Sequence, residues 1–323
     1  MDEGARRRRS GHPGLGLVTL SRSLRQILVV NAGSTSLKLS LVDADDTSTV
    51  VDDFARADAV GHRIVHSGEL ALEAGVIDDR LLTFVEAAAE IAPLHNRPAL
   101  AAIAQAREAL PDVPHVAVSD SHFHRSMLPE AREYAVPENW RTGYGIVRHG
   151  FHGLAVSWVA ERVAVARLVV CHLGGGCSVT AVAEGRSIDT TMGLTPLEGP
   201  PMGTRSGSFD PGALLYLVRR GLDVDELDRA LNEESGLSAL GGLDDPFAFA
   251  HFTYHVAKAV AAMSAALGGL DALAFSGGIG ENRNDVRRAI VARVAHLGEF
   301  RVEVVEPRED VMIARAVRAV LDR

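Results

Sequence analysis

The sequence QILVVNAGSTSLKLSLVDAD, residues 26–45, points directly to the fold class. An apolar run leads into a turn rich in glycine, serine and threonine and then into a second, alternating strand, which is typical of a β-hairpin. The sequence RLVVCHLGGGCSVTAVAEG, residues 167–185, repeats the same order of strand, glycine turn and strand. Two such segments in one chain predict an α/β protein built from two structurally related halves.

Predicted strands and helices alternate around these two hairpins. Short strand-like runs begin at residues 61 and 115, and residues 97–110 have the alanine- and leucine-rich spacing of a helix. Glycines at 268 and 269 mark the end of a long apolar helix over residues 246–267. Residues 271–282 predict a buried strand that enters a glycine-rich turn, and further helices are expected over residues 285–296 and 309–321.

Composition limits the function class. With 323 residues, 47% of them hydrophobic, the chain can form two domains, and a net charge of −9 argues against a nucleic-acid partner. No apolar run is long enough to cross a bilayer, so no membrane role is expected. Two cysteines indicate a reducing compartment, the cytoplasm. Residues 1–25 lack the features of a signal peptide and are expected to form a disordered extension.

Two turns could bind phosphate. In NAGSTSLK, residues 31–38, a small-residue turn offers backbone N–H groups, the Ser36 hydroxyl and the Lys38 charge. In HLGGG, residues 172–176, three glycines permit close approach of the backbone to an anion. Neither segment matches a Walker A loop, and SGGIGEN does not match the dinucleotide motif. Ordinary turns with relaxed glycine conformations remain an alternative for each segment.

The order of several longer motifs is similar to that of acetate kinases. These motifs are GHRIVHSGE, APLHN, SDSHFH, YGIVRHGFHG, DTTMGLTPLEG, MGTRSG and SGGIGEN, together with the two turns above. The sequence resembles this family from residue 26 to residue 323. The resemblance implies the two-lobed, duplicated fold shared with actin and sugar kinases, with residues 26–124 plus 311–323 in one lobe and residues 125–310 in the other. It also implies a homodimer that transfers phosphoryl reversibly from ATP to acetate, with Mg²⁺, giving acetyl phosphate and ADP.

Four residues match the catalytic positions of the family. Arg63 and Arg205 match two active-site arginines, and planar guanidinium groups suit a carboxylate and the charge of a transferring phosphoryl group. His152 in GFHG matches a histidine that can donate to a phosphoryl oxygen. Asp120 matches an essential acid. Because a carboxylate substrate is already ionised, we expect Asp120 to act beside Mg²⁺ rather than as a base.

The remaining site residues follow from the same resemblance. Those expected to bind the nucleotide are Lys38, Ser36, His172, Leu173, Gly174, Gly175, Gly176, Gly278, Ile279, Gly280, Glu281 and Asn282. Those expected to surround the carboxylate substrate are Arg63, Val65, Leu94, His95, Phe151 and Pro196. Asn31 and Glu309 match positions near Mg²⁺. The His251 and His255 pair lacks the glutamate of a zinc motif, and we interpret it as structural.

The sequence departs from the family pattern in three places. Gly175 replaces an asparagine, the segment between Asp53 and Gly61 is shorter by several tens of residues, and the Asp-x-Arg segment that contacts adenosine is missing before Pro246. Butyrate kinases also have glycine at the first of these positions. The alternatives are therefore a propionate or butyrate kinase, and a nucleotide-binding relative with little turnover.

Overall fold

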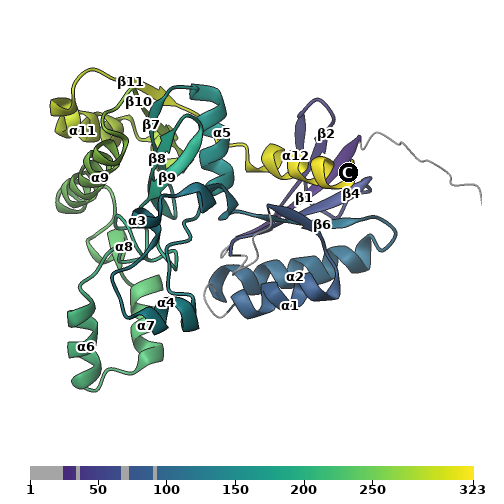
Figure 1. Ribbon diagram of the computed structural model, residues 1–323, viewed down its shortest axis with the longest axis horizontal. Helices are drawn as coiled ribbons and strands as arrows, with labels where there is room; N and C mark the ends of the chain where they lie inside the picture. Colours follow the sequence, from purple (N-terminus) through teal and green to yellow (C-terminus); the bar gives the residue numbers. More distant parts are fainter. Residues whose placement is uncertain (1–24, 34–36, 67–72, 90–92) are drawn as a thin grey trace, which may run out of the picture.

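The computed structural model consists of two lobes, each built around a β-sheet (Figure 1). The structure describes residues 25–33, 37–66, 73–89 and 93–323, and the side chains of residues 93–95 are outside this description. Residues 1–24 of the expected extension, Ser36, and the side chains of Leu94 and His95 therefore lie outside the described residues. Arg25 and Gln26, where description begins, donate their backbone N–H groups to Asp58.

The first sheet contains six strands in the order β3-β2-β1-β4-β6-β5. Their bounds are β1 Gln26–Ala32, β2 Leu37–Asp43, β3 Ser48–Val51, β4 Ala59–Ile64, β5 Ala74–Val76 and β6 His115–Ser119. The predicted hairpin is the antiparallel pair β1 and β2, while β4 lies parallel to β1 and β6 lies parallel to β4. Only a brief link, residues 52–58, joins β3 to β4.

The second sheet repeats this arrangement. Its strands are β7 Arg167–Leu173, β8 Cys177–Ala183, β9 Arg186–Thr190, β10 Ala272–Ser276 and β11 Arg301–Val304. Their order is β9-β8-β7-β10-β11, with an antiparallel hairpin β7–β8 and parallel neighbours β10 and β11. Apart from the added edge strand β5, both sheets follow the same path. The predicted duplication and the two-lobed α/β ATPase-like fold are therefore confirmed.

Helices cover both faces of each sheet (Figure 1), which explains why the central strands are apolar throughout rather than alternating. In the first lobe, Leu28 and Val30 pack toward α1 Asp79–Ala88 and α2 Pro93–Ala109, whereas Ile27 and Val29 pack against α12 Glu309–Leu321. In the second lobe, α9 Pro246–Leu267 and α11 Asn284–Val294 lie on one face and α5 Gly153–Val163 lies on the other.

Shorter helices complete the second lobe. They are η1 His122–Ser126, α3 Pro129–Arg132, α4 Glu138–Tyr144, α6 Pro211–Arg219, α7 Val224–Glu233, α8 Gly236–Ala239, α10 Gly277–Asn282 and η2 Ala295–Leu297. None of the helices in the described part of the chain is long and apolar enough to cross a membrane.

The predicted bounds of α9 and α12 are confirmed, and the left-handed φ of Gly268 ends α9 as expected. The glycine-rich turn predicted after β10 is wrong, because these residues form the short helix α10. Gly277, at φ +77°, turns the chain directly from the strand into that helix. The sequence shows no sign of this helix, because its glycines have low helix propensity. The limits of the two lobes at residues 124 and 310 remain a proposal.

Buried histidines should make the fold sensitive to acid. His62, His66 and His124 are at most 1% exposed, and burial lowers their pKa values from 6.5 to about 3, 3 and 4. Since the unfolded state then binds more protons below pH 6.5, this stability is complete above pH 6.5 and is lost as the pH falls toward 4. We expect the free energy of unfolding to fall by about 4 kcal/mol per pH unit from these three groups together. Urea unfolding followed by circular dichroism at pH 7.5, 6 and 5 measures it, and a flat profile would contradict the prediction.

Candidate active site

A cleft of about 670 Å³ lies between the two lobes. It is lined by predicted site residues from both sheets, namely Lys38, Arg63, Val65, Asp120, Phe151, His152, Gly175, Gly176, Pro196 and Arg205. Residues far apart in the sequence meet here because β1, β4 and β6 of one lobe and β7 of the other end at this cleft. The structure thus brings together the four predicted catalytic residues.

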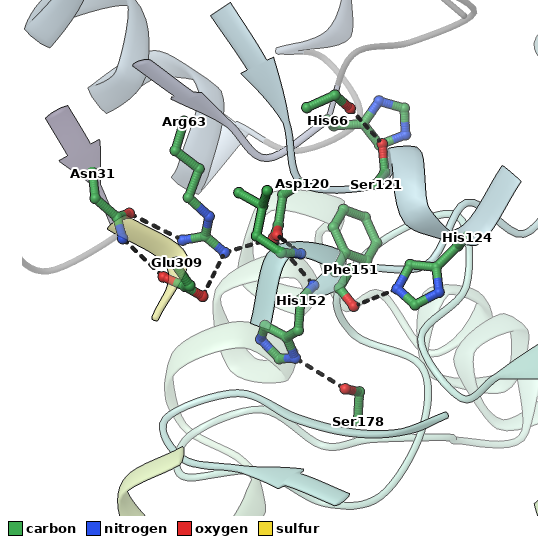
Figure 2. Close-up of polar contacts among 12 residues, drawn as sticks. Asn31, Arg63, His66, Asp120, Ser121, His124, Phe151, His152, Ser178 and Glu309 are labelled. Carbon is green, nitrogen blue, oxygen red and sulfur yellow. Dashed lines mark hydrogen bonds and ion pairs between the residues drawn. The ribbon is translucent and has the colours of Figure 1, made fainter. Parts of the chain in front are cut away.

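Arg63, near the end of β4, is held by oxygen atoms on several sides (Figure 2). Its Nη2 donates to Oδ2 of Asp120 at 2.6 Å and lies 3.9 Å from Oε1 of Glu309, and its Nη1 donates to Oδ1 of Asn31 at 3.3 Å. Asn31 in turn donates to Glu309 at 2.8 Å. Burial opposes the charge of Arg63, but the two carboxylates outweigh it and raise the pKa of Arg63. Arg63 is therefore already neutralised by protein groups.

Asp120 also fixes the start of α5. Its Oδ2 accepts the backbone N–H of His152 at 3.1 Å, its Oδ1 accepts that of Leu154 at 3.1 Å, and its backbone oxygen accepts that of Gly153 at 2.9 Å. A Cβ at Gly153 would lie 2.2 Å from that backbone oxygen, so only glycine fits. Burial would raise the pKa of Asp120, but the Arg63 charge and these hydrogen bonds hold it below the usual value. Ionised Asp120 is a poor base and a firm link between the lobes.

Arg205 differs from Arg63 because no carboxylate of the described part of the chain neutralises it. Its Nη1 donates to the backbone oxygen of Pro196 at 2.9 Å and its Nη2 to that of Gly175 at 3.5 Å, and no ion pair joins it to an acid within the described residues. Burial lowers the pKa of Arg205, although a guanidinium remains charged at neutral pH. A partly buried cation without a counter-ion is a binding site for an anion.

His152 and His172 form a pair of imidazoles beside Arg205, with ring centroids 4.4 Å apart. His152 takes the left-handed conformation, φ +61°, immediately before α5, and its Nδ1 lies 3.1 Å from Oγ of Ser178. His172, on β7, places its Nδ1 3.1 Å from Oγ of Ser276. Burial lowers the pKa values of both rings, with the positive charges of nearby groups adding to the effect on His152. Both are therefore neutral hydrogen-bonding groups near pH 7.

A small apolar surface lines the same cleft as the Arg205 guanidinium, which bonds the backbone oxygen of Pro196. Val65, Phe151 and Pro196 line the cleft and are buried, and Val65 and Phe151 belong to the core of the second lobe. Asn96 bonds the backbone of His66 through both its amide atoms, at 2.7 and 3.2 Å, and so fixes the start of α2 next to this surface. The backbone of Leu94 and His95 therefore lies close by. A guanidinium next to a small apolar surface suits a short carboxylate.

Comparison with known proteins identifies the family. The acetokinase family model matches residues 46–314, which is most of the chain. The chain belongs to the acetokinase family. An acetate kinase from Deinococcus deserti is 44% identical over 314 residues, covering 89% of this chain and 78% of that protein. An acetate kinase from Natranaerobius thermophilus is 36% identical over 332 residues, covering 88% and 83%.

Solved structures agree with this assignment. A propionate kinase from Francisella tularensis superposes with a TM-score of 0.83 at 31% identity, covering 91% of this chain and 99% of that one. An acetate kinase from Porphyromonas gingivalis gives a TM-score of 0.78 at 26% identity, covering 92% and 100%. As a member of the acetokinase family, the chain is a kinase, a phosphotransferase with a carboxyl group as acceptor.

Gly176, in the turn after β7, lies close to two hydrogen-bond donors of the cleft, the side chains of Arg205 and His152. A Cβ at Gly176 would lie 2.9 Å from Nη2 of Arg205 and 3.0 Å from Nε2 of His152, whereas a Cβ at Gly175 would meet nothing within 4 Å. We expect Gly176→Ala to displace both donors and to lower kcat by about 10- to 100-fold. Gly175→Ala, the matched control, should cause a smaller loss, because its methyl group enters open space. Steady-state kinetics compares the two, and equal losses would contradict the prediction.

Oxygen donors suitable for Mg²⁺ lie at the edge of the site. Glu309, whose side chain is 20% exposed, and Asn31, whose amide oxygen also accepts a hydrogen bond from Arg63, offer a carboxylate and an amide oxygen, which are the hard ligands that Mg²⁺ prefers. Asp120 is fully buried, and its oxygens already accept hydrogen bonds. The described residues contain no group of three or more potential ligands among histidine, cysteine and acidic residues. This donor set fits an ion that keeps several waters and is held mainly by phosphates.

The predicted nucleotide residues are only partly assembled at the cleft. Lys38 is exposed and lines it, but Leu173 is fully buried, so only its backbone could face a ligand. The residues of α10 do not line the cleft, although the start of this helix lies beside Gly174, where a Cβ would be 3.7 Å from the backbone nitrogen of Gly278. Just before Pro246, where the sequence resemblance leads us to expect the loss of an adenosine-contacting segment, Arg283 bonds Asp244 at 2.8 Å and joins α10 to the start of α9.

Several residues of the cleft were not predicted as site residues. Gly203 and Thr204 precede Arg205 in the quoted motif MGTRSG, so their position could have been inferred from it. Asn232 and Glu233 come from the end of α7 and carry no motif that indicates the cleft. Ser178, which contacts His152 but does not line the cleft, was also overlooked, because this contact joins two separate elements.

Proposed function

We propose that this chain is an acetate kinase that transfers the γ-phosphoryl group of ATP to acetate, giving acetyl phosphate and ADP, and that it also catalyses the reverse reaction. The observation that carries the proposal is the Arg205 guanidinium, which pairs with no acid among the described residues and lines the same cleft as the apolar side chains of Val65, Phe151 and Pro196. A carboxylate can occupy the charge while its methyl group contacts the apolar surface.

In the proposed reaction, an acetate oxygen forms a bond to the γ-phosphorus as the bond from that phosphorus to the β,γ-bridging oxygen breaks. The electron pair leaves with ADP. No proton is removed, since acetate is ionised at neutral pH. Arg205 and His152 lie where they can donate to the equatorial phosphoryl oxygens, and Arg63 is kept in position by Asp120 and Glu309. Lys38 adds positive charge for the other phosphates.

We further propose that Glu309 and Asn31 hold Mg²⁺, directly or through its waters. When bound, the ion neutralises charge on the nucleotide phosphates. Asp120 would hold Arg63 and the start of α5 in position close to Mg²⁺. Both of its carboxylate oxygens accept hydrogen bonds from the protein, so they are not assigned as ligands of the ion.

The acceptor is tested by measuring kcat/KM for formate, acetate, propionate and butyrate with Mg·ATP. Propionate is the second candidate, because the propionate kinase from Francisella tularensis superposes with a TM-score of 0.83. We expect kcat/KM for acetate to exceed that for butyrate at least about tenfold, since each extra methylene in a close-fitting pocket changes the binding free energy by about 1–3 kcal/mol. If kcat/KM were higher for propionate or butyrate than for acetate, the assignment of acetate as the substrate would be wrong.

We also propose that the protein forms a homodimer in the cytoplasm. Helix α6 has no buried residue, and Leu215, Tyr216 and Val218 on it are 56%, 60% and 42% exposed. Apolar side chains in this arrangement favour burial against a second copy. Free thiols at Cys171 and Cys177 are consistent with a reducing compartment. Light scattering that gives the mass of a monomer at micromolar concentration would refute the dimer.

A further inference from the structure

Ser178 is a serine on β8 whose side chain contacts a catalytic ring. It is fully buried, and its Oγ lies 3.1 Å from Nδ1 of His152 (Figure 2). Ser178 pairs with His172 across β7 and β8, and His172 pairs with Ser276 across β7 and β10. Directly paired residues point to the same face of a sheet. The hydroxyl groups of Ser178 and Ser276 therefore lie on either side of His172. Ser178 contacts the ring of His152, and Ser276 contacts the ring of His172.

The two neutral tautomers of His152 are not equivalent for the reaction. Nε2 is the ring atom beside the glycine turn, since a Cβ at Gly176 would be 3.0 Å from it. With the proton on Nε2, the ring donates a hydrogen bond to an anionic oxygen in the cleft. With the proton on Nδ1, a lone pair would face that oxygen and repel it. The ring has only one N–H, because burial and the nearby His172, Arg63 and Arg205 lower the pKa of His152 well below its usual value.

The Ser178 hydroxyl can select between these tautomers. Among the described residues, its Oγ has only one hydrogen-bond partner, Nδ1 of His152. If Nδ1 were protonated, it would donate to Oγ, and the hydroxyl proton of Ser178 would be left buried without an acceptor, which is costly. If Nδ1 is unprotonated, the hydroxyl donates to it, and both the hydroxyl and Nδ1 have a partner.

We propose that Ser178 is a positioning residue that holds His152 as the Nε2–H tautomer and so directs its N–H donor at the transferring phosphoryl group. The role in catalysis rests on the proposed function, whereas the tautomer assignment does not. Ser178 itself does not line the cleft. It acts through His152, as a hydroxyl counterpart of the groups that orient catalytic histidines in other enzymes.

The tautomer can be measured without any activity assay. In protein labelled with ¹⁵N-histidine, the His152 signals, assigned by their loss in His152→Ala, should show a protonated Nε2 and an unprotonated Nδ1 at pH 7.5. In Ser178→Ala, we expect the signals to shift toward a mixture of both tautomers. A protonated Nδ1 in the wild-type protein would overturn the proposal, whether or not the protein makes acetyl phosphate.

Kinetics then tests the role of this hydrogen bond in the reaction. Ser178→Ala should lower kcat by about tenfold while KM for acetate and ATP changes less than about twofold, because the donor acts mainly in the transition state. Ser178→Thr keeps a hydroxyl and should recover most of the rate. Ser157→Ala is the control, since its hydroxyl on α5 bonds the backbone oxygen of Leu154, and Ser157 neither lines the cleft nor forms a hydrogen bond with His152 in the described part of the chain.

A double-mutant cycle separates this role from a general structural one. In the His152→Ala background, Ser178→Ala should change kcat by less than about twofold, because the ring it orients is already absent. A tenfold loss in that background would overturn the proposal, as would full activity of Ser178→Ala in the wild-type background. If Ser178→Ala does not fold, the wild-type ¹⁵N spectrum and Ser178→Thr still decide the question.

Discussion

Arg205→Met should lower kcat by about 10³-fold while leaving the free energy of unfolding unchanged or slightly higher. The reason is the contrast between two arginines of one cleft. Arg205 has only backbone oxygens as partners among the described residues. Its charge therefore adds little to the stability of the protein without ligand and is available to a bound anion. Removing a partly buried, unpaired cation relieves a desolvation cost and removes the group that stabilises the transition state.

Steady-state kinetics and urea unfolding of the same preparations measure both effects of this substitution. Arg141→Met is the matched control, because Arg141 is 35% exposed on α4 and pairs with Glu133 at 3.2 Å. This control should change neither quantity by much, as expected for a surface ion pair. If Arg205→Met instead lost several kcal/mol of stability and kept its kcat, Arg205 would be structural and the assignment of an anion site would fail.

Asp120→Ala should have the largest effect on stability, with a decrease of about 3–5 kcal/mol in the free energy of unfolding. The substitution leaves the Arg63 charge without its nearest carboxylate and removes the acceptors for the N–H groups of His152 and Leu154. Activity should fall together with stability, because Arg63 and His152 both lose their positions. Urea unfolding by circular dichroism gives the first quantity and initial rates give the second.

A second substitution tests the cause of that instability. Asp120→Ala combined with Arg63→Met should be more stable than Asp120→Ala alone, because no uncompensated charge remains, but it should stay inactive. Asp271→Asn is the surface control, since Asp271 pairs with Arg167 where both side chains are at least 31% exposed, and it should cost less than about 1 kcal/mol. If Asp120→Ala were as stable as the wild-type protein, Asp120 would not link the lobes.

Much of the fold follows from local sequence signals. Residues 26–45 and 167–185 predict hairpins because their apolar runs are interrupted by turn residues, and both hairpins are present. The limits of α9 and α12 also follow from helix periodicity and from Gly268. The glycines of α10 conceal a helix, because its conformation depends on Gly277 and on the neighbouring end of β7 rather than on propensity.

The residues of the site were easier to predict from the sequence than the charges that surround them. The motifs around Arg63 and Arg205 identify both as cleft residues, but nothing local shows that only one is neutralised. That difference arises because Asp120, from the end of β6, and Glu309, at the start of α12, both approach Arg63. The pairing of Ser178 with His152 likewise joins β8 to the start of α5. Such contacts join elements that are far apart in the sequence, and local sequence patterns do not specify how those elements pack.

The most direct test of the proposed function is ³¹P NMR of the purified protein with ATP, Mg²⁺ and acetate. We expect an acyl phosphate signal to grow while the γ-phosphate signal of ATP declines in equal amount, and we expect neither change with Arg205→Met. Formation of ADP with inorganic phosphate but no acyl phosphate, or no reaction despite measurable ATP binding, would contradict phosphoryl transfer to a carboxylate in this cleft.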